Sequence, residues 1–174
     1  AEIAALLKRD GWGDTTAKQL AAWDPYDQNA SAPFFDPERM FGVQDGFDVV
    51  IGNPPYVSAL EFSRIYSADL RAQLNACYES ATGAYDYFVL FMERGLKLCK
   101  DGAHLIFITP NKYLAAKYAI GLRDWLLKNA SLRRLLDVSP VPVFKEAAVY
   151  PVVSIFCKGN RKTEVILAYL PLNK

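Results

Sequence analysis

The sequence predicts an α/β fold with a mostly parallel sheet and one antiparallel strand added late in the chain. Short apolar runs that are typical of buried strands alternate with segments of helical spacing. This alternation indicates β-α-β units, in which the strands are parallel. Near the C-terminus two apolar runs follow one another without a helix between them, which indicates an antiparallel pair.

The composition is that of one folded domain with a substantial core. The chain has 174 residues, of which 52% are hydrophobic, and its net charge is +1. No apolar run approaches the roughly 18 residues of a membrane span, and no signal peptide pattern is present. Cys77, Cys99 and Cys157 lack metal-ligand spacing, so we expect buried, reduced thiols in a cytoplasmic protein and no metal site. We expect His104, the only histidine, to cap or open a strand.

The elements are expected in two parts, a helical and irregular lead-in over residues 1–46 and the main unit over residues 47–174. Helices are predicted at residues 1–7, 15–23 (capped by Asp14 or Thr15), 83–100 (ended by Asp101-Gly102) and 114–129, with a partly helical polar segment at 58–79. Strands are predicted at residues 47–51, 104–109, 132–138, 149–157 (in a central position) and 162–170 (paired with 149–157 through a turn at Gly159-Asn160). Residues 25–46 are expected to form an irregular loop packed by Phe34, Phe35, Met40 and Phe41.

The most informative stretch is residues 47–56, Phe-Asp-Val-Val-Ile-Gly-Asn-Pro-Pro-Tyr. A central strand cannot continue through Pro54 and Pro55, because proline lacks an N–H group and fixes φ near −65°. The chain therefore leaves the strand at Asn53 in a stiff, extended form, with the carbonyl groups of Asn53 and Pro54 free to face a ligand. In open α/β sheets, ligands bind beyond the carboxyl ends of the strands.

A planar amine suits this strand end. The Asn53 amide oxygen and the Pro54 carbonyl offer two acceptors for the two N–H groups of an exocyclic amine. Two such bonds would draw the nitrogen lone pair out of conjugation and make it a nucleophile toward a methyl sulfonium. Tyr56 adds an aromatic face on which a base can stack. The alternative is an ordinary turn at the end of a strand.

Residues 46–57, Gly-Phe-Asp-Val-Val-Ile-Gly-Asn-Pro-Pro-Tyr-Val, resemble the catalytic motif of amino-group methyltransferases. Together with residues 35–38 (Phe-Asp-Pro-Glu) and 40–42 (Met-Phe-Gly), they make the chain similar to adenine-specific DNA methyltransferases of restriction–modification and phage-defence systems. Fused type IIG restriction–methylation enzymes are the most similar group, and the similarity covers about residues 26–158.

The resemblance identifies residues 47–174 as the catalytic-motif half of an S-adenosylmethionine-dependent methyltransferase fold. The strand and glycine loop that hold the cofactor in the family are missing before Phe47. We therefore expect a fragment of a larger restriction–methylation polypeptide, inactive by itself.

The resemblance implies methyl transfer from S-adenosylmethionine to the N6 amino group of an adenine flipped out of double-stranded DNA. In that reaction Asn53 and Pro54 would accept the amino N–H bonds. Tyr56 and Phe144 would stack on the flipped base and partly compensate for its lost stacking. A simple anchor for its loop is the alternative role of Phe144.

The resemblance also implies a cofactor pocket on the same strand end. Pro55 would contact the adenine ring of the cofactor, and Tyr87 and Phe91, on the helix after the motif, would line the pocket. Ordinary core packing is the alternative role for both aromatic residues.

Other functions remain open. The Asn-Pro-Pro-Tyr motif also occurs in enzymes that methylate a glutamine side chain or an RNA base, because an amide NH2 presents the same donors. A non-catalytic DNA-binding or interaction module is a third possibility. The acidic, aromatic lead-in and the long insert after Tyr56 favour DNA. Between residues 111 and 134, six basic residues oppose one aspartate, which suits contact with phosphates or an ordinary solvated helix face.

Overall fold

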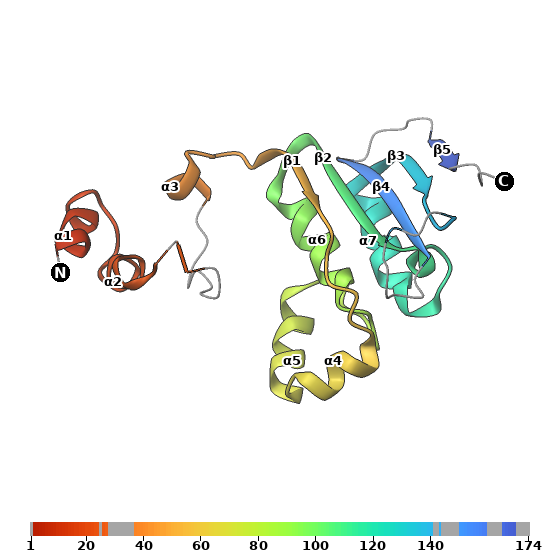
Figure 1. Cartoon of the computed structure of the whole chain (residues 1–174), viewed down its shortest axis with the longest axis horizontal. Coiled ribbons are helices and arrows are strands. Elements are labelled where there is room, and N and C mark those ends of the chain that lie inside the picture. The colour runs from red at the N-terminus through yellow and green to blue at the C-terminus, as the bar shows by residue number, and fades with distance from the viewer. Residues whose placement is uncertain are drawn as a thin grey trace. The chain divides into compact units, whose positions relative to one another are not determined.

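The computed structural model describes residues 2–24, 26–27, 37–140, 143, 150–159 and 165–169. The chain divides into two compact units, residues 1–44 and 45–174, each of which is described by itself (Figure 1). The described part of the first unit contains helices α1 (Glu2–Arg9), α2 (Asp14–Ala22) and α3 (Pro37–Phe41). Among the described residues, none of the helices has the length and apolar character needed to cross a membrane.

The first unit differs from the prediction in two details. α2 begins after Gly13, which makes no side-chain cap, so neither Asp14 nor Thr15 caps this helix. α3 lies within the segment that was expected to be irregular, because a proline at the first helical position is already in a helical conformation. Phe41 is 58% exposed. Phe34 and Phe35, and the side chain of Met40, lie outside the described residues.

The second unit is built on a five-stranded sheet with the order β1-β2-β4-β3-β5 (Figure 1). Its strands are β1 (Phe47–Gly52), β2 (Cys99–Pro110), β3 (Ala130–Asp137), β4 (Pro151–Lys158) and β5 (Ile166–Tyr169). Its helices are α4 (Ala59–Ile65), α5 (Ala68–Cys77), α6 (Phe88–Leu98) and α7 (Ile120–Asn129), with 3-10 turns η1 (Asn111–Leu114) and η2 (Lys117–Ala119). β1 is parallel to β2 and β3 is parallel to β5, whereas β4 is antiparallel to both of its neighbours. The predicted α/β class, with one late antiparallel strand, is confirmed.

The pairing of β5 was predicted wrongly. β5 pairs with β3 in parallel and not with β4 through a hairpin turn. β4 lies between β2 and β3, as its apolar sequence suggested, and both of its edges are therefore occupied. A later strand therefore has to join an outer edge of the sheet, and β5 joins the edge of β3.

The helix after the motif is shorter than predicted. α6 begins at Phe88 rather than at Gly83, and Gly83 has a φ of +67° that a right-handed helix cannot include. It ends at Leu98, and β2 already contains Asp101-Gly102, where the register between β1 and β2 shifts. The positive φ of Gly102 (+80°) thus belongs to an irregularity inside a strand.

The segment predicted as one helix from Leu114 to Asn129 is divided into η1, η2 and α7. Ala116 is extended (φ −65°, ψ 143°) and interrupts the helical path. The Arg123 guanidinium donates to the carbonyl groups of Tyr113 and Ala116 (both 2.8 Å), and these bonds replace the helical ones.

Two single-residue predictions also need correction. Cys99 and Cys157 are buried free thiols as expected, but Cys77 is exposed at the end of α5. His104 lies inside β2 and neither caps nor opens it.

The core lies between one face of the sheet and the helices. α6 packs against β1 and β2, and α7 packs against β3. Alternate residues of β2, among them Leu105 and Phe107, are buried in this layer. Gly95 allows α6 to approach β2 closely, because a Cβ at this position would lie 2.7 Å from the Leu105 side chain.

The other face of the sheet is apolar and partly exposed. Ile51 is the register partner of Ile106, and Ile106 is the register partner of Ile155, so the three side chains project from the same face. Ile51 is 75% exposed and the other two are half-buried. The sequence of β1 predicts a buried strand, but β1 is an edge strand of the sheet in this chain.

Candidate active site

The end of β1 presents the motif that the sequence singles out. The last register pair of β1 involves Gly52, and the chain then leaves the sheet. Asn53 and Pro55 are exposed, Pro54 is buried and Tyr56 is half-buried. Within the described part of the chain, no backbone hydrogen bond uses the carbonyl oxygen of Asn53 or of Pro54.

Two hydrogen bonds fix the segment that follows the motif against the start of α6. The carbonyl of Val57 accepts a bond from the N–H of Tyr87 (2.9 Å). The N–H of Ala59 donates to the Asp86 carboxylate (2.9 Å). Because both bonds bridge about thirty residues of sequence, the motif is held by α6 as well as by β1.

A capping box starts the helix immediately after the motif. The Ser58 hydroxyl caps α4 by accepting a bond from the N–H of Glu61, and the Glu61 carboxylate accepts bonds from the Ser58 N–H (2.9 Å) and hydroxyl (2.7 Å). These bonds hold the pKa of the exposed Glu61 carboxyl below its ordinary value. The motif therefore has a rigid element on each side, β1 before it and α4 after it.

A cavity of about 110 Å³ lies beside the motif. Its lining residues come from the ends of β1 and β2, the loop before α6 and the start of β4, and they are Tyr56, Ser58, Asp86, Phe88, Pro110, Asn111, Lys112 and Tyr150. The N–H of Asn111 donates to the carbonyl of Tyr150 (2.8 Å), which holds the end of β2 against the start of β4. The carboxyl ends of two parallel strands thus meet at one opening, where ligands of α/β sheets bind.

Tyr56, which lines this cavity, and Tyr118, which neighbours Asp86, are neutral at physiological pH. Burial raises the pKa of Tyr56 to about 12. Burial also raises the pKa of Tyr118, and the neighbouring Asp86 carboxylate raises it further. Tyr56 therefore offers an uncharged ring to the cavity.

The two aromatic residues predicted to line a cofactor pocket contact one another. The rings of Tyr87 and Phe91 meet edge to face with centroids 5.2 Å apart. Tyr87 also stacks on Phe62 (4.9 Å), so one face of its ring is used in the core. Phe91 is 36% exposed on α6 and remains accessible. Phe144 lies outside the described residues, and its stacking role stays a prediction.

Only Tyr56 among the lining residues was singled out from the sequence as a site residue; Ser58, Asp86, Phe88, Pro110, Asn111, Lys112 and Tyr150 were not. A signal for two of them was present, because Pro110 stops β2 as Pro54 stops β1, and Asn111-Lys112 follow directly. Since neighbouring parallel strands end at the same edge of a sheet, residues after both prolines had to lie close together. Asp86 and Tyr150 had no comparable signal, because their position depends on long-range packing.

The fold defines the class of protein first. A protein of Listeria monocytogenes described as a class I S-adenosylmethionine-dependent methyltransferase superposes with a TM-score of 0.58 and 22% identity, over 76% of this chain and 39% of that one. The type IIG restriction endonuclease BpuSI superposes with a TM-score of 0.54 and 26% identity, over 72% of this chain and 15% of that one. The chain therefore has an S-adenosylmethionine-dependent methyltransferase fold, and the assignment implies S-adenosylmethionine as the cofactor.

The family can then be stated. The model of the Eco57I restriction-modification methylase family matches residues 7–144, and the chain belongs to this family. The type II methyltransferase M.PaeR7I of Pseudomonas aeruginosa is 28% identical over 168 residues, which are 95% of this chain and 27% of that protein. The chain thus spans about a quarter of the length of this relative. The resemblance to restriction–modification methyltransferases noted in the sequence is confirmed.

Proposed function

We propose that this chain is the catalytic-motif part of a site-specific DNA methyltransferase that modifies the N6 amino group of a flipped adenine. The observation that carries the proposal is the end of β1, where the Asn53 and Pro54 carbonyl groups have no backbone partner in the described chain and Tyr56 lines a cavity. Membership of a restriction-modification methylase family supports a DNA substrate.

The chemistry assigned to the chain is the activation of an amine. The Asn53 amide oxygen and the Pro54 carbonyl would accept the two N–H bonds of the adenine amino group and direct its lone pair away from the ring. The activated nitrogen would accept a methyl group and then lose one of its amino protons. When bound, S-adenosylmethionine supplies that methyl sulfonium.

Tyr56 is assigned to base stacking because its ring lines the cavity and stays neutral. A neutral ring stacks on a base without adding charge to the reacting amine. Tyr150, at the same opening, supplies a second aromatic ring at the cavity mouth. Phe144 keeps its proposed role as the opposing stacking residue.

Three residues of this chain suit the cofactor. Pro55 is exposed at the strand end, and Phe91 is accessible on α6. The Tyr87–Val57 hydrogen bond holds the start of α6 against the motif segment, so both parts of the proposed pocket are fixed together. The glycine loop of the family is not found in this sequence, and for that reason we propose that the chain alone binds the cofactor weakly and is inactive.

The partly exposed apolar face of the sheet supports the same proposal. In α/β proteins, strands as apolar as β1 are covered on both faces. Val49 and Ile51 of β1 are 51% and 75% exposed. We propose that further parts of a larger restriction–methylation polypeptide cover this face.

The test of the proposed function is Asn53→Ala in the complete enzyme. The expected result is loss of methyl transfer to duplex DNA, with unchanged circular dichroism and thermal unfolding, because Asn53 is exposed. Gln73→Ala is a control, since Gln73 is an exposed amide on α5 that lines neither of the cavities near the motif. Near-normal turnover of the Asn53→Ala enzyme would remove the role assigned to Asn53.

The substrate class needs a separate measurement. Transfer of labelled methyl groups is compared on duplex DNA, RNA and protein, and modified adenine is identified in the digested DNA by mass spectrometry. We expect N6-methyladenine in DNA alone. Methylated glutamine, or methylated bases confined to RNA, would support the alternatives named above and reject DNA as the substrate.

The inactivity of the isolated chain is tested by calorimetric titration with S-adenosylmethionine. We expect weak binding or none. Micromolar affinity of the 174-residue chain would contradict the assignment of the cofactor loop to another part of the polypeptide.

A further inference from the structure

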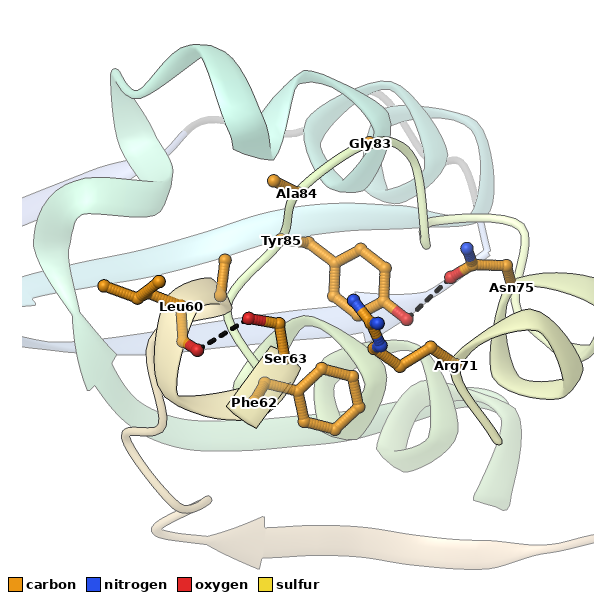
Figure 2. Close-up of a pocket in the computed structure, with 9 residues that line it drawn as sticks. Leu60, Phe62, Ser63, Arg71, Asn75, Gly83, Ala84 and Tyr85 are labelled. Carbon is orange, nitrogen blue, oxygen red and sulfur yellow. Dashed lines mark hydrogen bonds between the residues drawn. The ribbon is translucent and has the colours of Figure 1, made fainter. Parts of the chain in front are cut away.

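A second, larger cavity of about 510 Å³ lies between α4, α5 and the loop that precedes α6 (Figure 2). The lining residues are Ala59, Leu60, Phe62 and Ser63 of α4, Arg71 and Asn75 of α5, and Gly83, Ala84 and Tyr85 of the loop. None of these lining residues is acidic. Figure 2 shows that the Arg71 and Asn75 side chains reach the cavity from α5 on the side of the Tyr85 ring.

Arg71 is the unusual member of this set. Its Nε atom is buried and has no hydrogen-bond partner. Over the described ranges of the chain, no ion pair and no side-chain hydrogen bond involves its guanidinium group. Arg71 is half-buried, and a buried guanidinium nitrogen without a partner is costly, so an anionic ligand that accepts its N–H bond would remove this cost.

Among the cations in the described part of the chain, Arg71 alone has a buried side-chain nitrogen without a hydrogen-bond partner, whereas several others of this unit are paired. Lys97 binds Glu93, and Lys100 pairs with Asp48. Lys158 and Arg123 donate to backbone carbonyl groups. The charge of Arg71 is therefore available to a ligand from outside the chain.

The neighbours of Arg71 also leave donors for a ligand. The Tyr85 hydroxyl donates to the Asn75 side-chain oxygen (2.7 Å), so the Asn75 NH2 group is oriented away from this bond. The Ser63 hydroxyl donates to the Leu60 carbonyl (2.7 Å), as Figure 2 shows. The guanidinium group of an arginine can form two parallel hydrogen bonds to phosphate oxygens, and a nearby amide NH2 group can donate another. The Leu60 and Tyr85 side chains offer apolar surface to an adjoining sugar or base.

The second cavity shares a wall with the first. Ala59 lines the second cavity and Asp86 lines the first, and the two are joined by the hydrogen bond from the Ala59 N–H to the Asp86 carboxylate. Tyr85 and Asp86 are likewise consecutive residues that face different cavities. A polynucleotide strand that inserts one base into the first cavity would therefore pass close to Arg71.

We propose that this second cavity binds a backbone phosphate, with its adjoining sugar, of the DNA strand whose base enters the first cavity. The inference rests on the proposed function, because that function supplies the DNA strand. In this role Arg71 is a positioning residue that fixes the strand and does not touch the reacting amine. Asn75 donates a second bond to the same phosphate.

The test is a titration of the 174-residue chain with the trinucleotide d(TpTpT), followed by nuclear magnetic resonance at the Arg71 Nε–H signal. We expect a saturating shift of this signal and of the Asn75 NH2 signals. A trinucleotide with uncharged methylphosphonate linkages should produce no shift at Arg71, because it lacks the phosphate charge. Equal shifts with both trinucleotides, or none with either, would overturn the proposal.

Matched variants separate a specific site from general charge. Arg71→Ala should weaken d(TpTpT) binding about tenfold to a hundredfold, the usual range for a lost charge-assisted bond. Arg71→Lys, which keeps the charge but not the fork, should lose less. Arg64→Ala removes an exposed arginine of α4 that does not line the cavity, and it should change the affinity less than twofold. Equal losses in Arg71→Ala and Arg64→Ala would overturn the site, as would equal saturation by inorganic phosphate at the same concentration.

The result of the d(TpTpT) titration does not depend on methyl transfer. If the complete enzyme transfers methyl groups through Asn53 but Arg71 shows no phosphate-dependent shift, this inference alone is wrong. If the Arg71 shift is present and Asn53→Ala retains full turnover, the proposed function is wrong while the phosphate site stands.

Discussion

Replacing Glu93 by glutamine is expected to destabilise the chain strongly, because this carboxylate is buried at the centre of a small polar cluster. Glu93 lies on α6 and has no exposed surface. It accepts hydrogen bonds from the Lys97 ammonium (2.5 Å) and from the backbone N–H groups of Ser80 (2.7 Å) and Glu79 (3.2 Å). These bonds attach residues 79–80, which precede the loop that lines the second cavity, to α6.

The size of the effect follows from these three bonds. Glutamine has the same shape but no charge, and its NH2 group must face at least one donor. The substitution removes the acceptor for one of the three donors, Lys97, Ser80 or Glu79, and weakens the other two hydrogen bonds because the carboxylate charge is gone. Together these losses lower the free energy of unfolding by about 3 kcal/mol at pH 7. For a chain of this size that corresponds to a decrease in Tm of about 10 °C.

The pH dependence gives a second signature. Burial by itself raises the pKa of the Glu93 carboxyl, but the bonds from Lys97, Ser80 and Glu79 outweigh burial and hold the pKa below its ordinary value of 4.5. The stabilising contribution is therefore present above pH 4.5 and is lost as the pH falls through the lower pKa of the folded state. The difference in stability between the wild type and Glu93→Gln should shrink below pH 4.5.

The assay is urea unfolding followed by circular dichroism between pH 3 and pH 7. Glu79→Gln is a matched control, because the Glu79 side chain is 74% exposed and lies 4.0 Å from the same lysine. This control should lose less than about 0.5 kcal/mol. A loss below about 1 kcal/mol in Glu93→Gln, or a loss equal to that of the control, would refute the reasoning.

Three further predictions concern the fold around the site. Gly46→Ala should lower the free energy of unfolding by about 3 kcal/mol, because Gly46 has a φ of +101° and a Cβ there would lie 2.8 Å from the backbone at Leu98. Gly13→Ala is the comparison: no atom lies within 4 Å of a Cβ at this position, so the free energy of unfolding should change little. Tyr113→Phe should cost about 1–2 kcal/mol, because it removes the buried bond between the Tyr113 and Ser154 hydroxyl groups (2.5 Å), and a double-mutant cycle with Ser154→Ala measures this coupling. Burial raises the pKa of both Tyr56 and Tyr113 to about 12, so ultraviolet titration should detect no ionisation of either below about pH 11, and stability should fall above pH 10, where the unfolded chain ionises first.

Much of the sheet could be predicted from the sequence because its strands are unusually apolar. β1, β2, β3 and β4 all lie where continuous apolar runs predicted strands, and each boundary is wrong by only a few residues except at the start of β2. The proline stops at Pro54 and Pro110 fixed two strand ends, because a backbone without an N–H group cannot extend a sheet ladder. These are local constraints, so they can be read from one stretch of chain.

The candidate site was only partly predictable for the same reason. The exit of the chain at Asn53 depends on the two prolines that follow it, and the structure has this exit. The cavity, in contrast, requires Tyr150 and Asp86 to lie beside Tyr56, although they are far apart in sequence. The start of α6 at Phe88 is likewise set by long-range bonds, because Asp86 is held by the N–H of Ala59.

The sequence by itself determined the α/β class, the late antiparallel strand and a rigid strand end at Asn53-Pro54, because each depends on hydrophobic periodicity or on the geometry of proline. The tertiary structure alone decided that β5 joins β3, that β1 is an edge strand, and that Arg71 borders a cavity without an anionic partner. The physical reason is that strand pairing and the burial of a charge depend on which surfaces are already occupied. That occupation is a property of the packed chain and is not encoded in any short segment of it.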